Sequence, residues 1–267
     1  VVRRIAVALV ALLACTLGLG CRETPPAALA PTRLTVFAAS SLTESFKAIG
    51  AAFERAHPGV RVEFNFASSS ALATQIAEAA PADVFASADN ANMEKVASRS
   101  LIAGQAVAFA RNTPVIVVPA DNRAKIEAAR NLARPGVKVV LAAADVPIGS
   151  YARQVLDRLA ADPAYGASFR DAALRNVVSN EANVRAVLTK VELGEADAGI
   201  VYRTDAAVSG SKVRTVALPE SANVIAVYPI AVLQAARQPE AARAFVAFVH
   251  SAEGQQALRS AGFDPAP

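Results

Sequence analysis

The sequence is poor in the residue types that metal and redox chemistry need. Its 267 residues include two cysteines, two histidines, one methionine and no tryptophan. Cys15 lies inside an apolar amino-terminal segment, so a chain processed after Gly20 keeps only Cys21 and forms no internal disulfide. No histidine, cysteine and carboxylate residues cluster with metal-site spacing. We therefore expect no disulfide framework, no metal-cation site and no cofactor.

Motifs of catalysis and of nucleic-acid binding are missing as well. The chain has no Gly-x-Ser-x-Gly and no Gly-x-x-x-x-Gly-Lys-Ser/Thr sequence, which excludes the hydrolase elbow and the P-loop. The net charge is only +4, and no run of lysine or arginine follows residue 4, so nucleic acid is not an expected partner. We expect a protein that is not an enzyme. A serine hydrolase using Ser41 or Ser69 is a remote alternative, because neither His57 nor His250 is placed to activate them.

The amino terminus has the organisation of an export signal. Two arginines precede an apolar segment, Ile5–Leu19, which is shorter than the roughly 20 residues that a membrane-spanning helix needs. Cys21 directly follows a glycine, as in the cleavage box of bacterial lipoproteins. We predict a signal peptide over residues 1–20, a Pro/Ala-rich tether over 21–32, and a lipid anchor on Cys21. An ordinary signal with an incidental cysteine is the alternative, and both predict an exported protein, in the periplasm or on the outer face of a membrane.

Strand and helix patterns alternate along the rest of the chain. Apolar runs predict strands over 34–39, 60–66, 107–110, 114–119, 137–141, 175–179, 198–202, 213–218 and 224–233, with a period of two over 60–66. A short strand and a turn are predicted within 81–89. Helical spacing follows most of these runs, with Asn180 as a candidate cap for the helix that carries Val184. Arg203–Asp205 is predicted as a polar turn. This alternation is typical of an α/β architecture with mostly parallel sheets.

Four of the predicted strand-to-helix turns offer hydrogen-bond donors and no cation. The first N–H groups of a helix lack partners and favour an anion. Right-handed crossovers place such turns at the carboxyl edge of a sheet, where ligands bind. The turns are Ser40-Ser41, Ser68-Ser69-Ser70, Pro147-Ile148-Gly149 and Asn183-Val184. Their distribution over both halves of the chain indicates a cleft between two lobes that closes on one small anion.

Each serine turn also has a purely structural explanation. Ser41 and Glu44 have capping-box spacing, so the Ser41 hydroxyl is a candidate for holding its own helix. In the triple-serine turn, any one hydroxyl is a candidate N-cap. No Glu or Gln stands three residues after Ser69 or Ser70, so no reciprocal capping box involves them. Asp83 and Asp89 are interpreted as turn and cap residues.

In their order, these motifs resemble those of the periplasmic molybdate-binding proteins of ABC transporters. The resemblance covers residues 33–263 and rests on the segments 36–42, 66–76, 80–89, 146–151 and 199–202. It implies a two-lobed periplasmic binding protein fold of type II. Each lobe would be a mostly parallel sheet flanked by helices, with the ligand cleft between the lobes. Lobe 1 would comprise residues 33–112 and 225–267, lobe 2 residues 113–224, with hinges near 111–114 and 222–228.

The resemblance also implies a set of ligand contacts. In that family, hydroxyls from two serine turns, two backbone N–H groups and a tyrosine hydroxyl hold a tetrahedral oxyanion. The matching positions in this chain are Ser40, Ser41, Ser69, Ile148, Val184 and Tyr202. Ile148 replaces a small residue that is common in the family, but a contact through its N–H survives that change.

A site made only of donors favours a fully deprotonated dianion. Phosphate near neutral pH keeps a proton and needs an acceptor, whereas sulfate, molybdate and tungstate do not. The resemblance favours molybdate and does not separate it from tungstate. It implies a monomeric solute-binding protein that delivers the anion to the membrane permease of an ABC transporter and that touches the membrane only through its lipid anchor. A binding protein for sulfate or thiosulfate is the alternative.

Overall fold

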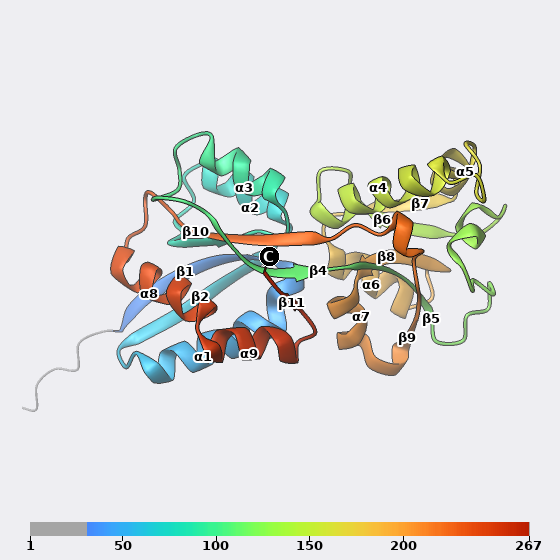
Figure 1. Ribbon diagram of the computed structural model, residues 1–267. Coiled ribbons are helices and arrows are strands. Elements are labelled where there is room, and N and C mark those ends of the chain that lie inside the picture. The colour runs from blue at the N-terminus through green and yellow to red at the C-terminus, as the bar shows by residue number, and fades with distance from the viewer. Residues whose placement is uncertain (1–30, 267) are drawn as a thin grey trace, which may run out of the picture. The chain divides into compact units, whose positions relative to one another are not determined.

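A computed structural model of the chain describes residues 31–266. The predicted signal peptide, most of the predicted tether and the lipidation of Cys21 lie outside these residues. Within them, no helix combines the length and the apolar character needed to cross a membrane. The described chain forms two lobes, each built on one β-sheet that is flanked by helices (Figure 1).

The sheet of lobe 1 contains six strands in the order β11-β4-β10-β3-β1-β2. The strands are β1 (Thr32–Ala39), β2 (Val60–Ala67), β3 (Val84–Ala86), β4 (Val107–Asn112), β10 (Ala226–Val232) and β11 (Asp264–Pro265). Strand β1 is parallel to both β2 and β3, and its pairing with β2 continues to the last pair, Ala39 with Ala67. The two serine turns that follow β1 and β2 therefore begin side by side.

The sheet of lobe 2 contains five strands in the order β7-β6-β8-β5-β9. The strands are β5 (Pro114–Pro119), β6 (Val139–Ala142), β7 (Val177–Glu181), β8 (Ala198–Tyr202) and β9 (Val213–Val216). Strand β6 is parallel to β7 and to β8. The turns after these three strands consequently share one edge of the sheet, and each of the three leads toward a helix.

Both sheets are mixed, which corrects the expectation of mostly parallel sheets. Strand β10 is antiparallel to β3 and β4, and β5 is antiparallel to β8 and β9. The reason is that the chain crosses between the sheets twice, in opposite directions. It passes from β4 to β5 through Thr113 and returns from β9 to β10 through residues 217–225. These crossings lie at the predicted hinge segments, and motion about them stays a prediction.

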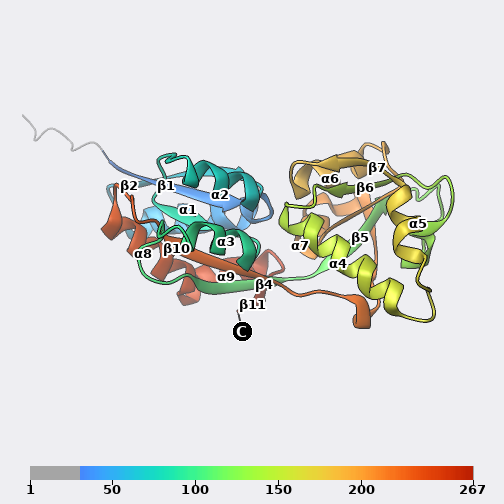
Figure 2. The same ribbon diagram turned by 90° about the horizontal axis from the view of Figure 1, so that it is seen from above.

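Nine helices flank the two sheets within residues 31–266 (Figures 1 and 2). In the pictures, α2 and α3 cover one face of the lobe 1 sheet, and α1, α8 and α9 cover the other. The helices are α1 (Thr43–Ala56), α2 (Ser69–Ala77), α3 (Asn90–Ala97), α4 (Pro147–Ala161), α5 (Phe169–Arg175), α6 (Val184–Glu192), α7 (Arg203–Ser209), α8 (Pro239–His250) and α9 (Ala252–Ser260). Short 3-10 turns occupy Ser40–Leu42, Ala129–Ala133, Gly210–Lys212 and Glu220–Ala222.

The first turn of α7 replaces the polar turn that was predicted at Arg203–Asp205. Tyr202 ends β8 in an extended conformation and serves as the N-cap position of α7. Asp205 lies in the first turn, where the positive end of the helix dipole favours an acidic side chain. The helix was missed because it is short and lacks an apolar repeat.

Alternate side chains of the lobe 1 strands pack into two separate apolar layers, as the period of two requires. Val36 belongs to the layer of α1 and α8, whereas Phe37 belongs to the layer of α2 and α3. At the centre of the first layer, the Phe46 ring lies 5.6 Å from the Phe109 ring and 6.1 Å from the Phe245 ring, between centroids. These layers hold the strand ends, and hence the turns after them, in fixed positions.

Asp83 lies at a bend directly before β3, and its buried carboxylate ties three segments of lobe 1 together, a role that its interpretation as a turn residue did not include. Its Oδ2 accepts a 2.8 Å hydrogen bond from the Thr35 N–H in β1. Its Oδ1 accepts from the N–H groups of Arg237 and Gln238, at 2.7 and 2.9 Å. The side chain thus anchors the start of α8 to the strand that leads into the Ser40 turn.

Replacement of this carboxylate is expected to weaken the fold. In Asp83→Asn the amide NH₂ group faces the Thr35 N–H, so we expect the free energy of unfolding to fall by roughly 1–3 kcal/mol. Urea denaturation measures the change. The control is Asp121→Asn, which breaks an exposed pair with Arg123 and should cost less than about 1 kcal/mol. Equal losses in both variants would contradict the anchoring role.

Candidate functional site

All of the predicted ligand residues line one small pocket between the lobes. Its volume is about 10 Å³, which corresponds to roughly one water-sized sphere, whereas pockets for organic ligands measure about 300–1,000 Å³. The predicted residues that line it are Ser40, Ser41 and Ser69 from lobe 1, and Ile148, Val184 and Tyr202 from lobe 2. The structure therefore brings together every residue of the predicted set, around a space that suits a very small ligand.

The three side chains of the triple-serine turn form different hydrogen bonds. Ser68 is the N-cap of α2, and its hydroxyl oxygen accepts a 3.3 Å hydrogen bond from the Ala71 N–H. The Ser70 hydroxyl lies 3.2 Å from the Ser68 hydroxyl. Ser69 instead accepts a 2.9 Å hydrogen bond from the Ala88 N–H. Because the Ser69 oxygen already accepts, its own O–H is available to donate, and both Ser69 and Ala88 line the pocket.

The Ser41 side chain does not cap its own helix, which removes the structural explanation given for it. A 3-10 turn over Ser40–Leu42 runs directly into α1, and Leu42 at the N-cap position has helical rather than extended dihedral angles. The Ser41 hydroxyl lies 3.0 Å from the hydroxyl of Tyr228 on β10. Sequence reasoning missed Tyr228, since only the chain's return to lobe 1 places it behind the serine.

In lobe 2, a glycine allows the start of α4 to approach the sheet closely. Pro147 occupies the first helical position, where a missing N–H costs nothing. The next N–H, of Ile148, belongs to the first turn and has no partner within the helix. A Cβ atom on Gly149 would lie 2.0 Å from the Ala143 carbonyl oxygen and 2.5 Å from that of Ala142. Only glycine therefore permits the backbone path that brings the Ile148 N–H to the pocket.

The start of α6 presents the second backbone donor. Val184 is its first residue, and the Asn183 side chain caps the helix by accepting a 3.0 Å hydrogen bond from the Ala186 N–H. The cap is thus Asn183 and not Asn180, which was the candidate from sequence. Asn180 lies within β7, because that strand continues to Glu181.

Tyr202 carries the clearest sign of a missing partner. Its side chain is 1% exposed, and no group within residues 31–266 forms a hydrogen bond with its hydroxyl. Burial, followed by the neighbouring Tyr228, Tyr151 and Asp89, raises the pKa of this hydroxyl well above its usual value. The group therefore stays protonated and able to donate. An unpaired buried polar group costs about 1–3 kcal/mol, a cost that an acceptor in the pocket would remove.

The polar side chains of the pocket wall are serine and tyrosine hydroxyls, and no lysine or arginine belongs to its lining in the part of the chain that the structure describes. The nearby Asp89 carboxylate is already used. It caps α3, as predicted, accepting hydrogen bonds from the N–H and the side-chain amide of Asn92, both at 2.9 Å. Burial raises the pKa of Asp89 above its ordinary value. The described part of the site thus offers an anion neutral dipoles and no direct ion pair.

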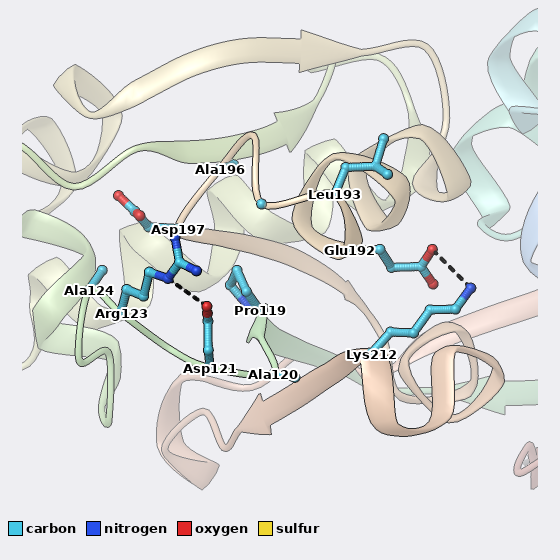
Figure 3. Close-up of a pocket in the computed structure, with 11 residues that line it drawn as sticks. Pro119, Ala120, Asp121, Arg123, Ala124, Glu192, Leu193, Ala196, Asp197 and Lys212 are labelled. Carbon is cyan, nitrogen blue, oxygen red and sulfur yellow. Dashed lines mark ion pairs between the residues drawn. The ribbon is translucent and has the colours of Figure 1, made fainter.

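A larger pocket in lobe 2 does not offer comparable chemistry. It measures about 380 Å³ and lies near the carboxyl end of α6 (Figure 3). Four of its charged side chains form two ion pairs, Arg123 with Asp121 at 2.6 Å and Lys212 with Glu192 at 3.8 Å. The Asp197 carboxylate accepts a 2.8 Å hydrogen bond from the Lys138 N–H. Nor does any group of three or more His, Cys, Asp or Glu residues suited to a metal ion occur within residues 31–266.

The two histidines are engaged outside the pocket. The His57 ring stacks on Phe53 with 4.1 Å between centroids, and its Nδ1 lies 3.1 Å from the Phe53 carbonyl oxygen. The His250 ring contacts the carbonyl oxygens of Val246 and Ala108. Neither ring forms a hydrogen bond with Ser41 or Ser69 in the described part of the chain. The arrangement lacks the base that a serine nucleophile requires.

Two α/β lobes joined by two crossings, with a small donor-lined pocket between them, define a two-lobed ligand-binding protein. The chain belongs to the family of bacterial extracellular solute-binding proteins, whose model matches residues 34–264. It is 47% identical over 230 residues to the molybdate-binding protein ModA of Mycobacterium tuberculosis H37Rv, covering 86% of this chain and 84% of the relative. The family predicted from the motifs is confirmed.

Solved structures confirm the predicted periplasmic binding protein fold. The sulfate-binding protein SubI of Mycobacterium tuberculosis H37Rv superposes with a TM-score of 0.78 and 22% identity, covering 88% of this chain and 87% of that one. The periplasmic molybdate-binding protein of Azotobacter vinelandii superposes with a TM-score of 0.75 and 19% identity, covering 88% of this chain and 100% of that one. At these identities the likeness concerns the fold alone.

The two buried tyrosines should respond differently to loss of their hydroxyls. Tyr228→Phe removes the partner of Ser41, so we expect ligand-free protein to lose about 1 kcal/mol of unfolding free energy. Tyr202→Phe removes an oxygen that has no partner in the described part of the chain, and should be neutral or stabilising. Urea denaturation of both variants without added oxyanions measures this. A loss in Tyr202→Phe as large as in Tyr228→Phe would show that the Tyr202 hydroxyl already has a partner.

The buried Asp205 predicts a dependence of stability on pH. Burial raises the pKa of this carboxyl to about 7, against a lowering influence of Arg185. Between the pKa of the unfolded chain, about 4, and 7, the folded state holds a proton that the unfolded state has lost. The contribution of Asp205 to stability therefore falls as pH rises through this window.

The variant Asp205→Asn isolates this effect, because its amide does not titrate. Urea denaturation at several pH values between 4.5 and 7.5 measures the difference in unfolding free energy between the two proteins. We expect wild type to lose stability relative to the variant as pH rises. A constant difference, or one of opposite sign, would exclude a raised pKa at Asp205.

Proposed function

We propose that the protein is a solute-binding protein that captures molybdate, and tungstate with it, and delivers it to an ABC transporter permease. The observation that carries the proposal is the buried Tyr202 hydroxyl, which has no hydrogen-bond partner within residues 31–266 and lines the pocket with the donors of the helix starts. The 47% identity to a relative named molybdate-binding protein supports the choice of anion.

The chemistry of the donors supports a dianion over phosphate. Ser69 uses its oxygen to accept from Ala88 and has its proton left to donate, and the helix starts at Ile148 and Val184 add backbone N–H groups. Monoprotonated phosphate would bring a hydrogen that needs an acceptor, whereas the nearby Asp89 is occupied by Asn92. Molybdate and tungstate carry two charges and no proton near neutral pH, and so match a set of donors.

Sulfate is the second candidate, since it is also an unprotonated dianion. It is smaller than molybdate, so the same donors would close on it less completely. The likeness to a sulfate-binding protein is one of fold, at 22% identity. Identity to the mycobacterial molybdate-binding relative is about twice as high, which favours molybdate.

The proposal includes a mode of action without catalysis. The protein acts as a monomer outside the cytoplasm, needs no cofactor, and closes its lobes about the crossings near Thr113 and residues 217–225. The family description as extracellular supports export. A lipid on Cys21, followed by the Pro/Ala-rich tether, would hold the protein near the permease. The engagement of both histidines outside the pocket argues against a serine hydrolase.

Isothermal titration calorimetry of the full mature protein tests the choice of anion. We expect heat with molybdate and tungstate, weaker binding of sulfate, and no binding of phosphate at neutral pH. Tight sulfate binding with no heat from molybdate would replace the proposal by its second candidate. Absence of heat with all four anions would overturn it.

The assigned role of Ser69 is tested by Ser69→Ala. Loss of one hydrogen bond to a charged group should weaken molybdate binding by roughly 1.5–3 kcal/mol, which is about 10- to 150-fold. The matched control is Ser70→Ala, which changes the next serine of the same turn but does not touch the pocket lining. Titration of both variants with molybdate gives the comparison. Wild-type affinity in Ser69→Ala would remove Ser69 from the ligand set.

A further inference from the structure

One arginine joins the two lobes directly beside the pocket. Arg185 follows Val184, whose N–H is a proposed ligand donor at the start of α6. Its guanidinium forms a two-pronged ion pair with Glu44 in the first turn of α1. Glu44 in turn stands three residues after Ser41. The pair therefore connects the two helix starts, one from each lobe, that bring donors to the oxyanion.

The arginine is held in place from its own lobe by a buried carboxylate. Its Nε lies 2.7 Å from Oδ1 of Asp205 in α7, whose side chain is 0% exposed. The contact is close but poorly aligned, since neither Nε nor the Asp205 oxygens complete a hydrogen bond. Asp205 thus orients Arg185 but leaves the hydrogen-bond donors of its guanidinium free for another acceptor. The aligned hydrogen bonds of the guanidinium go to Glu44 across the cleft.

Charge explains why this contact matters for an anion site. Glu44 near the start of α1 places a negative charge close to Ser41, where it repels an incoming dianion. When Arg185 reaches Glu44, the repulsion is neutralised without a cation entering the pocket. Separation of the lobes breaks the pair and exposes the dianion to the carboxylate again.

The pair is accessible to water and is therefore able to open. The Arg185 and Glu44 side chains are 24% and 46% exposed. They line a cavity of about 190 Å³ that also touches Ser41, so water reaches the pair from the side of that cavity. An ion pair with this exposure makes a modest contribution, as a reversible closure requires.

We propose that the Glu44–Arg185 ion pair is a latch of the closed lobes that slows release of the bound oxyanion. The inference rests on the proposed function and extends it, by naming two positioning residues that do not touch the ligand. Because the pair exists only between the lobes, it acts mainly on the dissociation rate. It also positions the Val184 N–H, through the backbone that Arg185 shares with it.

Stopped-flow measurement of tyrosine fluorescence tests the latch in the full mature protein, which has no tryptophan. Molybdate is the ligand that is bound and released. Glu44→Gln is the principal variant, because Glu44 is half-exposed and its change leaves Arg185 paired with Asp205. We expect the dissociation rate to rise about 3- to 5-fold. The association rate should rise by a smaller factor, because the variant also removes the repulsion between Glu44 and the incoming dianion. Arg185→Gln should give a similar rise, and the double variant no more than either alone. The control is Glu63→Gln, which breaks the exposed Arg33–Glu63 pair within lobe 1.

Salt distinguishes a latch from a merely structural role. The wild-type dissociation rate should increase with ionic strength, whereas the Glu44→Gln rate should change much less. If wild type binds molybdate and Glu44→Gln releases it at the wild-type rate, the latch is overturned while the proposed function stands. If wild type binds none of the four anions, the proposed function fails, and the latch with it.

Discussion

Hydrogen-bond donors that have no partner within the described chain are the constraint on which this structure depends. The first turns of α4 and α6 contain backbone N–H groups that have no partner within their own helix. Tyr202 buries a hydroxyl from which no group in the described chain accepts a hydrogen bond. Burial of unpaired donors is unfavourable in a protein interior, so the closed arrangement requires an acceptor from outside. In the function proposed above, a single dianion would accept from all of these donors at once and so couple closure of the lobes to occupancy of the site.

The fold converts this local requirement into one site. Strands β1 and β2 end in register at Ala39 and Ala67, which sets the serine turns side by side. In lobe 2, the close approach of Gly149 to the end of β6 places the start of α4, and with it the Ile148 N–H, at the pocket. Two crossings join the lobes, and the predicted motion about them would leave both sets of donors undisturbed. Capture and release of a ligand require two rigid lobes and a flexible connection between them.

The charged residues are placed around the site rather than in it. A cation in contact with the anion would bind it tightly and release it slowly. Arg185 instead pairs with Glu44 across the cleft, and its Nε contacts the buried carboxylate of Asp205. Its charge therefore acts on the balance between open and closed lobes. In this arrangement, neutral dipoles recognise the oxyanion, and a water-accessible ion pair, Glu44 with Arg185, slows its release.

The sequence by itself determined the α/β class, nearly all strands, and the six residues of the candidate site, because apolar runs and donor-rich turns are local patterns. It left open which serine caps α2, and it misjudged Asn180, the helix after Tyr202 and the parallel character of the sheets. Tertiary structure decided these points. Tyr228 reaches Ser41 across 187 residues and Ala88 reaches Ser69 across 19, and no local pattern encodes such pairings. Strand direction likewise depended on the two crossings, a property of the whole chain path.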